Sequence, residues 1–489
     1  MKKHIILSIV LLGALSACKK SWLEIVPLGS QVASTTDDYD KLMNDNKFYA
    51  IRTGGLAEAQ LMGDEISAEG AYFANLDPVY DYRGLYFAWA DSIYTSAGAQ
   101  PFGLRNHLDQ VYQLNKIINE VMASSGGTES QKKALRAEAL ANRAWSNFHM
   151  ANYYCKPYLA STASSDPGFP KIVNADVTIN NFPRGTVQDT YDFIIKDLTD
   201  ALADIPTRFT IATRMSRPAV EGLIGKVYLF MGRYTDALPM LKAALADVAA
   251  NGQTTLYNYN QTLGAGGSFL PIDPNNGPIN SPGQIVSDMT ESVVYKSYLS
   301  GPYSGNATGN NGLVLTPQVQ ALYGSTDLRL KFYSNTNKDN SINPSGRLRK
   351  YNVLYTRWCL QLPELYLLSA ECKARTNDLS GAVADVETLR KNRMPPADAT
   401  VPAAIAGNQN ALIKFIIDER TREFALEGYR WFDMRRLSVD PLYAGISFTH
   451  TIYNANGTTT VYTLKQPNRL VLQFPRYITD VNPTMTNNP

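Results

Sequence analysis

The sequence predicts a mainly α-helical protein, in which a scaffold of repeated helical pairs carries a loop-rich lobe with minor β structure. Two observations predict this fold class. In several segments apolar residues recur at spacings of three and four, which gives a helix one buried face. Between these segments, residues 251–311 contain nine glycines and many Asn, Pro and Tyr residues, with little periodicity. A structureless segment of this length is rare in a compact domain unless it has a function.

The first seventeen residues are typical of an export signal. Lys2 and Lys3 precede an apolar run from Ile5 to Leu15, which is too short to span a bilayer. The next residues, Leu-Ser-Ala-Cys, resemble the box of a bacterial lipoprotein, in which the cysteine is acylated and the chain is cut before it. We therefore expect the mature chain to begin at Cys18 and to be anchored to the membrane through lipid. The alternative is an ordinary signal peptide with a chance cysteine.

The charge balance of the chain bears on the class of partner that it could bind. The chain has 46 basic and 44 acidic side chains, and two of the basic ones lie in the leader, so residues 18–489 carry 44 of each. This balance argues against a nucleic-acid partner.

Cys155, Cys359 and Cys372 have spacings that match no metal or redox motif. We expect Cys359 and Cys372 to be buried and reduced on packed helices, although a disulfide between them stays open.

Three helices are predicted in the first half of the chain. Residues 102–123 place apolar side chains on one face, and a second helix follows from about 131 to 154. The turn at 124–127, Ser-Ser-Gly-Gly, joins them as an antiparallel pair. Residues 186–204 begin with the cap-like Thr186 and form another amphipathic helix.

A repeated helical unit is the most diagnostic scaffold feature. Residues 219–245 match the spacing of one tetratricopeptide unit, in which small residues let two helices approach closely. A weaker copy lies at 365–393. Either copy alone fits an ordinary helical hairpin, but two copies in one chain favour repeat packing. The matching residues are Gly225, Tyr228, Gly232, Tyr234, Ala237, Leu241 and Ala244 in the first copy, and Ala370, Ala382, Val386 and Leu389 in the second.

Residues 417–437, IDERTREFALEGYRWFDMRRL, closely resemble the C-terminal signature of the SusD/RagB family. Further resemblances are SWLEIVPLGS, AEALANRAWSNFHMANYY, TYDFIIKDLTDALADIP, the repeat at 219–245, Asp327-Leu328-Arg329 and the ending FPRYITDVNPTMTNNP. The likeness therefore covers essentially the whole chain. The residues that match the signature are Glu419, Arg420, Glu423, Phe424, Glu427, Gly428, Arg430, Trp431, Asp433 and Arg435.

The resemblance implies a SusD-like domain over residues 18–489, after a leader at 1–17. We expect helical repeat pairs at about 102–154, 186–250 and 355–437, and a loop-rich binding lobe at about 60–100 and 251–350. Short alternating runs near the C-terminus, such as Gly457–Leu464, predict a small hairpin.

We predict that the signature is structural and not catalytic. Its ten charged side chains from Asp418 to Arg436 balance at five and five. Asp418 lies four residues before Arg422, and Arg420 lies three before Glu423, spacings that pair charges on a helix. The segment therefore predicts a self-satisfied ion network beside Trp431.

Two segments have the composition of a ligand-binding surface. Sugars present apolar faces and many hydroxyls, so a binding site needs aromatic platforms flanked by polar side chains. Segments 64–100 and 295–311 supply that mixture. For any one ring, packing within the loop is the alternative. The candidate ligand-binding residues are Asp64, Tyr72, Arg83, Tyr86, Trp89, Tyr94, Tyr298 and Tyr303, with Trp89 and Tyr298 foremost.

We expect no cofactor, no metal and no catalytic residue. His107, His149 and His450 are far apart in sequence, and no nucleophile elbow or phosphate-binding loop occurs.

The resemblance implies a surface lipoprotein of the outer membrane that delivers captured oligosaccharide to a SusC-like TonB-dependent barrel. Lys19 and Lys20 follow Cys18, where surface-export tags are often acidic. The alternatives are peptide capture as in the RagB branch, a surface polysaccharide hydrolase with two carboxylates in a cleft, and a structural repeat adaptor.

Overall fold

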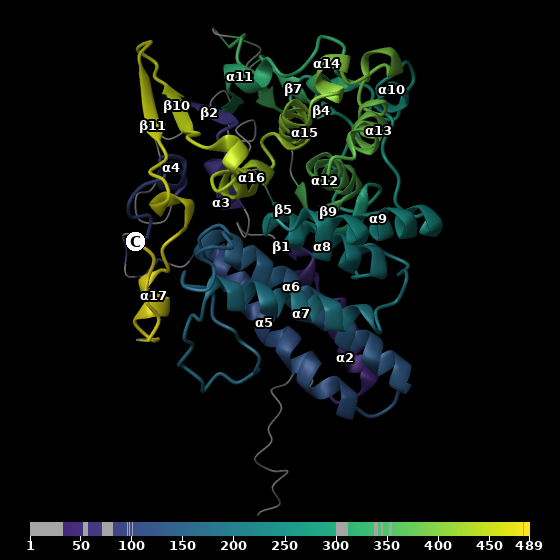
Figure 1. Ribbon diagram of the computed structural model, residues 1–489, viewed down its shortest axis with the longest axis vertical. Coiled ribbons are helices and arrows are strands. Elements are labelled where there is room, and N and C mark those ends of the chain that lie inside the picture. Colours follow the sequence, from purple (N-terminus) through teal and green to yellow (C-terminus); the bar gives the residue numbers. More distant parts are fainter. Residues whose placement is uncertain are drawn as a thin grey trace, which may run out of the picture.

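Neighbouring helices pack in pairs to form the scaffold, as the computed structural model shows (Figure 1). In the first group, α6 (Glu129–Tyr154) packs against both α5 (Phe102–Glu120) and α7 (Val187–Leu202). The structure describes residues 33–51, 57–70, 82–94, 96, 98–99, 101–299, 312–336, 341–343, 346–351, 355–482 and 484–489. The helices of this group are α2 (Thr36–Met43), α5 (Phe102–Glu120), α6 (Glu129–Tyr154) and α7 (Val187–Leu202).

Helix α6 is the centre of this group. It begins with a capping box, in which the hydroxyl of Thr128 accepts from the Gln131 backbone and the Gln131 side chain accepts from the Thr128 backbone. Every side chain from Ala137 to Tyr154 is buried. Its buried charges are paired with other segments: Arg143 donates to Asp197 on α7 at 2.8 Å. The predicted antiparallel pair at 102–154 is confirmed.

The repeat unit at 219–245 is also confirmed. It consists of α8 (Arg217–Phe230) and α9 (Tyr234–Asn251), joined by a tight turn in which Gly232 has a φ of +73°. Gly225 allows the close approach, because a Cβ there would lie 2.5 Å from Cγ of Leu241. The small residue is therefore required by the packing of the two helices.

A second helical group follows. Helix α12 packs on α9, α13 and α15, and the four residues that define the weaker repeat copy are fully buried. Figure 1 shows α12, α13 and α15 at the upper end, α2, α5 and α7 at the lower end, and α8 and α9 between them. The mainly α prediction is thus confirmed. The helices are α12 (Leu362–Arg375), α13 (Leu379–Arg390), α15 (Gln409–Phe424) and α16 (Tyr429–Leu437).

Strands form four small sheets among the described residues. A three-stranded sheet has the order β1-β5-β9, and a four-stranded sheet has the order β11-β10-β2-β6. The predicted hairpin is confirmed as β10–β11, but residues 355–361, expected at the start of a helical pair, form strand β9. The strands are β1 (Ala50–Ile51), β2 (Ile66–Glu69), β3 (Ile272–Asp273), β4 (Gly277–Pro278), β5 (Ser292–Leu299), β6 (Leu313–Leu315), β7 (Tyr333–Ser334), β8 (Arg349–Lys350), β9 (Tyr355–Gln361), β10 (Thr449–Tyr453) and β11 (Thr459–Thr463).

Short helices connect these elements. Among the described residues, no helix has the length and apolar character needed to cross a membrane. Cys155, Cys359 and Cys372 are buried free thiols, although Cys359 lies on β9 and not on a helix. The short helices are η2 (Asn46–Phe48), α3 (Ala57–Met62), α4 (Arg83–Phe87), η4 (Val121–Ala123), α10 (Tyr259–Thr262), α11 (Pro317–Gln320), η7 (Leu328–Phe332), η8 (Pro396–Asp398), α14 (Ala403–Ala406), η9 (Pro441–Tyr443), η10 (Asn468–Leu470) and α17 (Arg476–Thr479).

Candidate functional site

Four of the predicted ligand-binding rings are core residues. Tyr86, Trp89, Tyr94 and Tyr298 expose 7% of their surface or less. The indole N–H of Trp89 donates to the Met62 carbonyl at 3.1 Å, and its ring stacks on the His450 imidazole at 3.8 Å between centroids. Because these rings expose almost no surface, their burial gives no support to the expectation that they contact a ligand. They stabilise the lobe from inside.

The other predicted site residues have mixed placements. Asp64 is partly buried and accepts from the Arg430 guanidinium at 2.6 Å, so it fixes the turn before β2 to α16. Arg83 is partly buried at the start of α4. Tyr72, Tyr303 and the lipidation site Cys18 lie outside the described residues, so they stay predictions.

The start of the first predicted recognition segment and the residues after the second are neighbours in the fold. Strand β2, which ends at Glu69, lies near the start of the first segment, and β6 begins at Leu313, directly after the second. The two strands pair antiparallel with Ala68 opposite Leu313, and the Glu69 N–H donates to the Gly312 carbonyl at 3.0 Å. Residues more than 200 positions apart in sequence therefore meet at one end of the four-stranded sheet.

A polar cluster with an aromatic ring lies at this sheet end. It consists of Glu69, Asn343, Arg347 and Tyr453, which we call the sheet-end cluster. The Arg347 guanidinium binds both Glu69 carboxylate oxygens, at 2.8 and 2.9 Å, and lies 3.6 Å from the centroid of the Tyr453 ring. The Asn343 amide donates to Glu69 at 3.1 Å. The Glu69 and Arg347 side chains keep 18% and 17% of their surface exposed.

The sheet-end cluster has the chemistry of a sugar-binding surface. A guanidinium stacked on an aromatic ring and held by a carboxylate is a flat, rigid unit, and the amide and carboxylate beside it add donors and acceptors. Sequence reasoning missed Arg347 and Tyr453. The alternation near the C-terminus predicted a strand there, but its parallel pairing with β2, which sets Tyr453 opposite Glu69, has no local signal.

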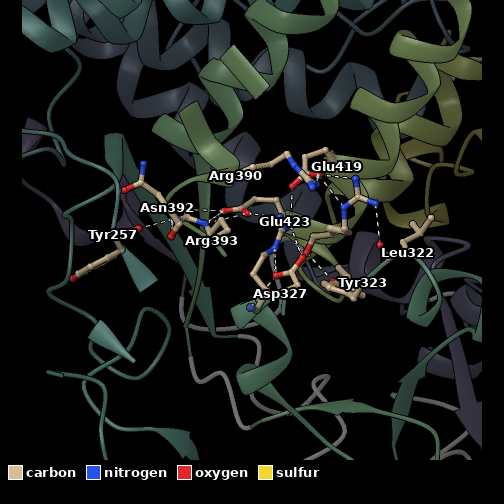
Figure 2. Close-up of polar contacts among 12 residues, drawn as sticks. Tyr257, Leu322, Tyr323, Asp327, Arg390, Asn392, Arg393, Glu419 and Glu423 are labelled. Atoms are coloured by element: carbon tan, nitrogen blue, oxygen red, sulfur yellow. Dashed lines mark hydrogen bonds and ion pairs between the residues drawn. The ribbon is translucent and has the colours of Figure 1, made fainter. Parts of the chain in front are cut away.

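The family-like signature forms a buried ion network (Figure 2). The Glu419 carboxylate lies 2.7 Å from Arg329, 2.8 Å from Arg390 and 2.6 Å from Arg422. Glu423 is held by Arg329 at 2.9 Å and Arg393 at 2.8 Å. Burial raises the pKa of Glu419, but the three arginines lower it further, so the net pKa is well below its ordinary value.

Pairs between helices complete the network. Arg420 donates to Asp433 at 2.9 Å, and Arg436 donates to Glu371 on α12 at 2.7 Å. The arginines around Asp433 lower its pKa to about 2 against the effect of burial. The direct ion pairs differ from the predicted ones, because Arg422 binds Glu419 and Arg420 binds Asp433, although the charge of Arg422 still acts on Asp418. The network is not self-satisfied, because buried charges take partners from the facing helices.

The remaining signature residues also bind the scaffold. Glu427 accepts from Lys350 at 2.5 Å, and Trp431 is fully buried. Arg435 is buried and donates to the Cys155 carbonyl, and burial lowers its pKa to about 10. Carboxylates held by arginine in this way stay ionised and lack the proton of a general acid. Among the described residues, no group of three or more His, Cys, Asp and Glu side chains is arranged to hold a metal.

Comparisons with known proteins cover both halves of the chain. Residues 81–229 match the SusD-like family model described as "Starch-binding associating with outer membrane", and residues 290–489 match the SusD family model. A search of curated proteins finds no match.

Solved structures share the fold over nearly the full length. A SusD superfamily protein from Bacteroides thetaiotaomicron is 17% identical with a TM-score of 0.72, covering 93% of this chain and 100% of that one. A SusD-like carbohydrate binding protein from Bacteroides vulgatus is 17% identical with a TM-score of 0.66, covering 93% and 98%. A SusD-like protein from Bacteroides fragilis is 16% identical with a TM-score of 0.64, covering 93% and 97%. With the signature, the helical repeats and both family models in agreement, the chain belongs to the SusD/RagB family.

Proposed function

We propose that this protein captures oligosaccharide outside the cell and delivers it to a SusC-like TonB-dependent barrel of the outer membrane, without making or breaking a bond. At the level of the family, carbohydrate binding and association with the outer membrane are supported by the matching models and by a solved relative described as a carbohydrate binding protein. The oligosaccharide site and the delivery step belong to the proposal.

One observation carries the proposed site. The start of the first recognition segment and the residues after the second meet at the sheet end beside Arg347 and Tyr453, so a ligand there would contact the stacked ring and guanidinium. Tyr72 and Tyr303, which belong to these segments, are our proposed further contacts.

The pKa values and burial of the signature carboxylates support the proposal that the protein catalyses no reaction. Glu419, Glu423 and Asp433 all have a lowered pKa because arginines surround them, and all are buried. They would serve neither as a proton donor nor as a nucleophile open to a polymeric substrate.

The anchor and the partner complete the proposal. Acylation of Cys18 would hold the protein at the outer membrane, and the helical scaffold would offer the surface that meets the barrel. Deleting the gene for the partner barrel should abolish uptake of the ligand. Undiminished uptake would refute the delivery step while leaving capture intact.

The first test is calorimetric titration of residues 19–489 with maltoheptaose, cellohexaose, xylohexaose, mannohexaose and a peptide mixture, with product analysis of each solution. We expect saturable binding of one oligosaccharide without cleavage. Tyr453→Ala should weaken that binding roughly 3- to 10-fold, the range for loss of one stacked ring. The matched control Tyr112→Ala removes a tyrosine that is 38% exposed on α5 and should leave affinity unchanged.

Each of the other outcomes of this titration would support a different function for the protein. Binding of peptide alone would assign the protein to a RagB-like role. Cleavage would assign it to the hydrolases. No binding of any probe would favour a structural adaptor.

A further inference from the structure

Two hollows flank the loop between α7 and α8, on the helical scaffold. The first has a volume of about 330 Å³ and lies between this loop, the end of α9 and the residues before β5. The second has a volume of about 490 Å³ and lies between the same loop, α2 and α6. Phe209 and Arg214 line both hollows, so their side chains form a ridge between them, which we call the Phe209 ridge.

The Phe209 ridge is a fixed structure. Its base is Arg214, whose buried guanidinium binds Glu138 at 2.6 Å and Asp40 at 2.9 Å. The guanidinium carbon lies 4.8 Å from the centroid of the partly buried Phe209 ring. The loop is held on both sides, because the Ala212 carbonyl accepts from the Tyr295 N–H and the Thr207 carbonyl accepts from the Asn251 amide at 2.9 Å. An aromatic ring held in this way needs little further ordering when it binds a ligand.

The walls on either side are polar, and those of the first hollow are largely uncharged. In the first hollow, Arg214 is the one charged residue among those that line it, and Thr210, Asn251, Gln253, Thr254 and Thr290 supply hydroxyl and amide groups. In the second, Asp37, Asp40 and Glu138 supply carboxylate acceptors, of which Asp40 and Glu138 bind Arg214, and Gln131 supplies an amide. Such walls match the hydroxyls of a neutral sugar, and the ring between them matches its apolar face. A peptide would instead seek apolar pockets or unpaired strand edges.

We propose that the Phe209 ridge and its two hollows are a second carbohydrate-binding site. It is separate from the sheet-end cluster, because none of its lining residues comes from β2, β6 or β10. In Figure 1, α2 lies at the lower end of the molecule, whereas β2 and β10 lie at the upper end. The inference rests on the proposed function, since it gives the captured oligosaccharide a second contact surface on the same chain.

Amide hydrogen exchange of residues 19–489 locates the site. The probe is whichever of the four oligosaccharides binds, added at saturation. We expect slower exchange in two separate regions, residues 207–216 with 251–255, and residues 66–70 with 346–351. Phe209→Ala should remove the protection of the first region and keep that of the second. Gln253 is exposed, so Gln253→Ala should leave the fold intact. This variant should also reduce the protection of the first region.

The results separate this inference from the proposed function. If an oligosaccharide binds but protects only residues 66–70 and 346–351, or if Phe209→Ala leaves all protection unchanged, the second site is refuted and capture stands. If none of the four oligosaccharides binds the wild-type chain, the proposed function itself fails. Tyr112→Ala is the matched control and should reproduce the wild-type protection in both regions.

Discussion

Glu65 is a buried carboxyl group whose protonation depends on the fold. It has no exposed surface, and one oxygen accepts from the Leu426 N–H at 3.3 Å while the other has no hydrogen-bond partner among the described residues. Burial, together with the nearby charge of Asp64, raises its pKa to about 8. Between about pH 4.5 and pH 8 the folded chain therefore keeps a proton that the unfolded chain releases, so this residue lowers stability as the pH rises.

Glu65→Gln should remove this pH dependence. The amide keeps the shape of the protonated acid and cannot ionise, so the variant should gain stability over the wild type by up to about 1.4 kcal/mol per pH unit across that window. Thermal unfolding of both proteins from pH 5 to pH 8 measures the difference. Glu129→Gln, at an exposed position on α6, is the control and should follow the wild type. Parallel curves for Glu65→Gln and wild type would show that Glu65 is ionised in the fold.

Single residues show where sequence reasoning succeeded and where it failed. The signature residues were correctly expected to be structural, because a dense, balanced set of charges beside aromatic residues implies mutual pairing. The choice of Trp89 and Tyr298 as ligand contacts finds no support in their burial, because an aromatic-rich segment does not tell which rings face inward. Trp89 turns inward through a φ of 46°, which its sequence neighbours do not reveal.

At the scale of elements, local patterns predicted what local contacts make. The α8–α9 pair follows from small residues at repeat spacing, and the β10–β11 hairpin follows from alternation around a short turn. The pairing of β2 with β6 and β10 joins segments hundreds of residues apart, and β2 has only four residues. The sheet-end cluster depends on these pairings, so it could not be predicted without the fold.

The α8–α9 contact gives a test of the repeat. Gly225→Ala would place a methyl group 2.5 Å from Cγ of the fully buried Leu241, which forces the helices apart. Overpacking of this kind lowers the free energy of unfolding by about 1–3 kcal/mol. The higher helix propensity of alanine over glycine offsets at most about 1 kcal/mol of this loss. The midpoint of thermal unfolding should therefore fall. Gly324→Ala is the control, because no atom lies within 4 Å of the added carbon, and its midpoint should stay unchanged. An unchanged midpoint for Gly225→Ala would mean that the helices do not pack as closely as described.

At the scale of the whole molecule, the signature connects distant parts of the chain. Through Arg329, Arg390 and Arg393, the α15 carboxylates Glu419 and Glu423 bind η7, the last residue of α13 and the turn that follows it. Arg393 also binds Glu291, which lies directly before β5. The network therefore joins the helical scaffold to the strands that carry the loop-rich lobe. Replacing a buried ion pair by apolar residues is often neutral, but removing one partner leaves the other charges buried and unpaired.

Glu419→Gln should therefore destabilise the whole protein. Three arginines would lose their shared carboxylate, and breaking a buried pair in this way costs about 3–5 kcal/mol. Thermal unfolding at pH 7 should show a clear drop in the midpoint, whereas the control Asp200→Asn, which breaks the exposed pair with Lys196, should change stability by less than about 0.5 kcal/mol. Below its midpoint, the folded Glu419→Gln variant should bind oligosaccharide with wild-type affinity, because Glu419 is buried away from the sheet-end cluster. A variant that keeps its stability but loses binding would instead assign Glu419 to the ligand site.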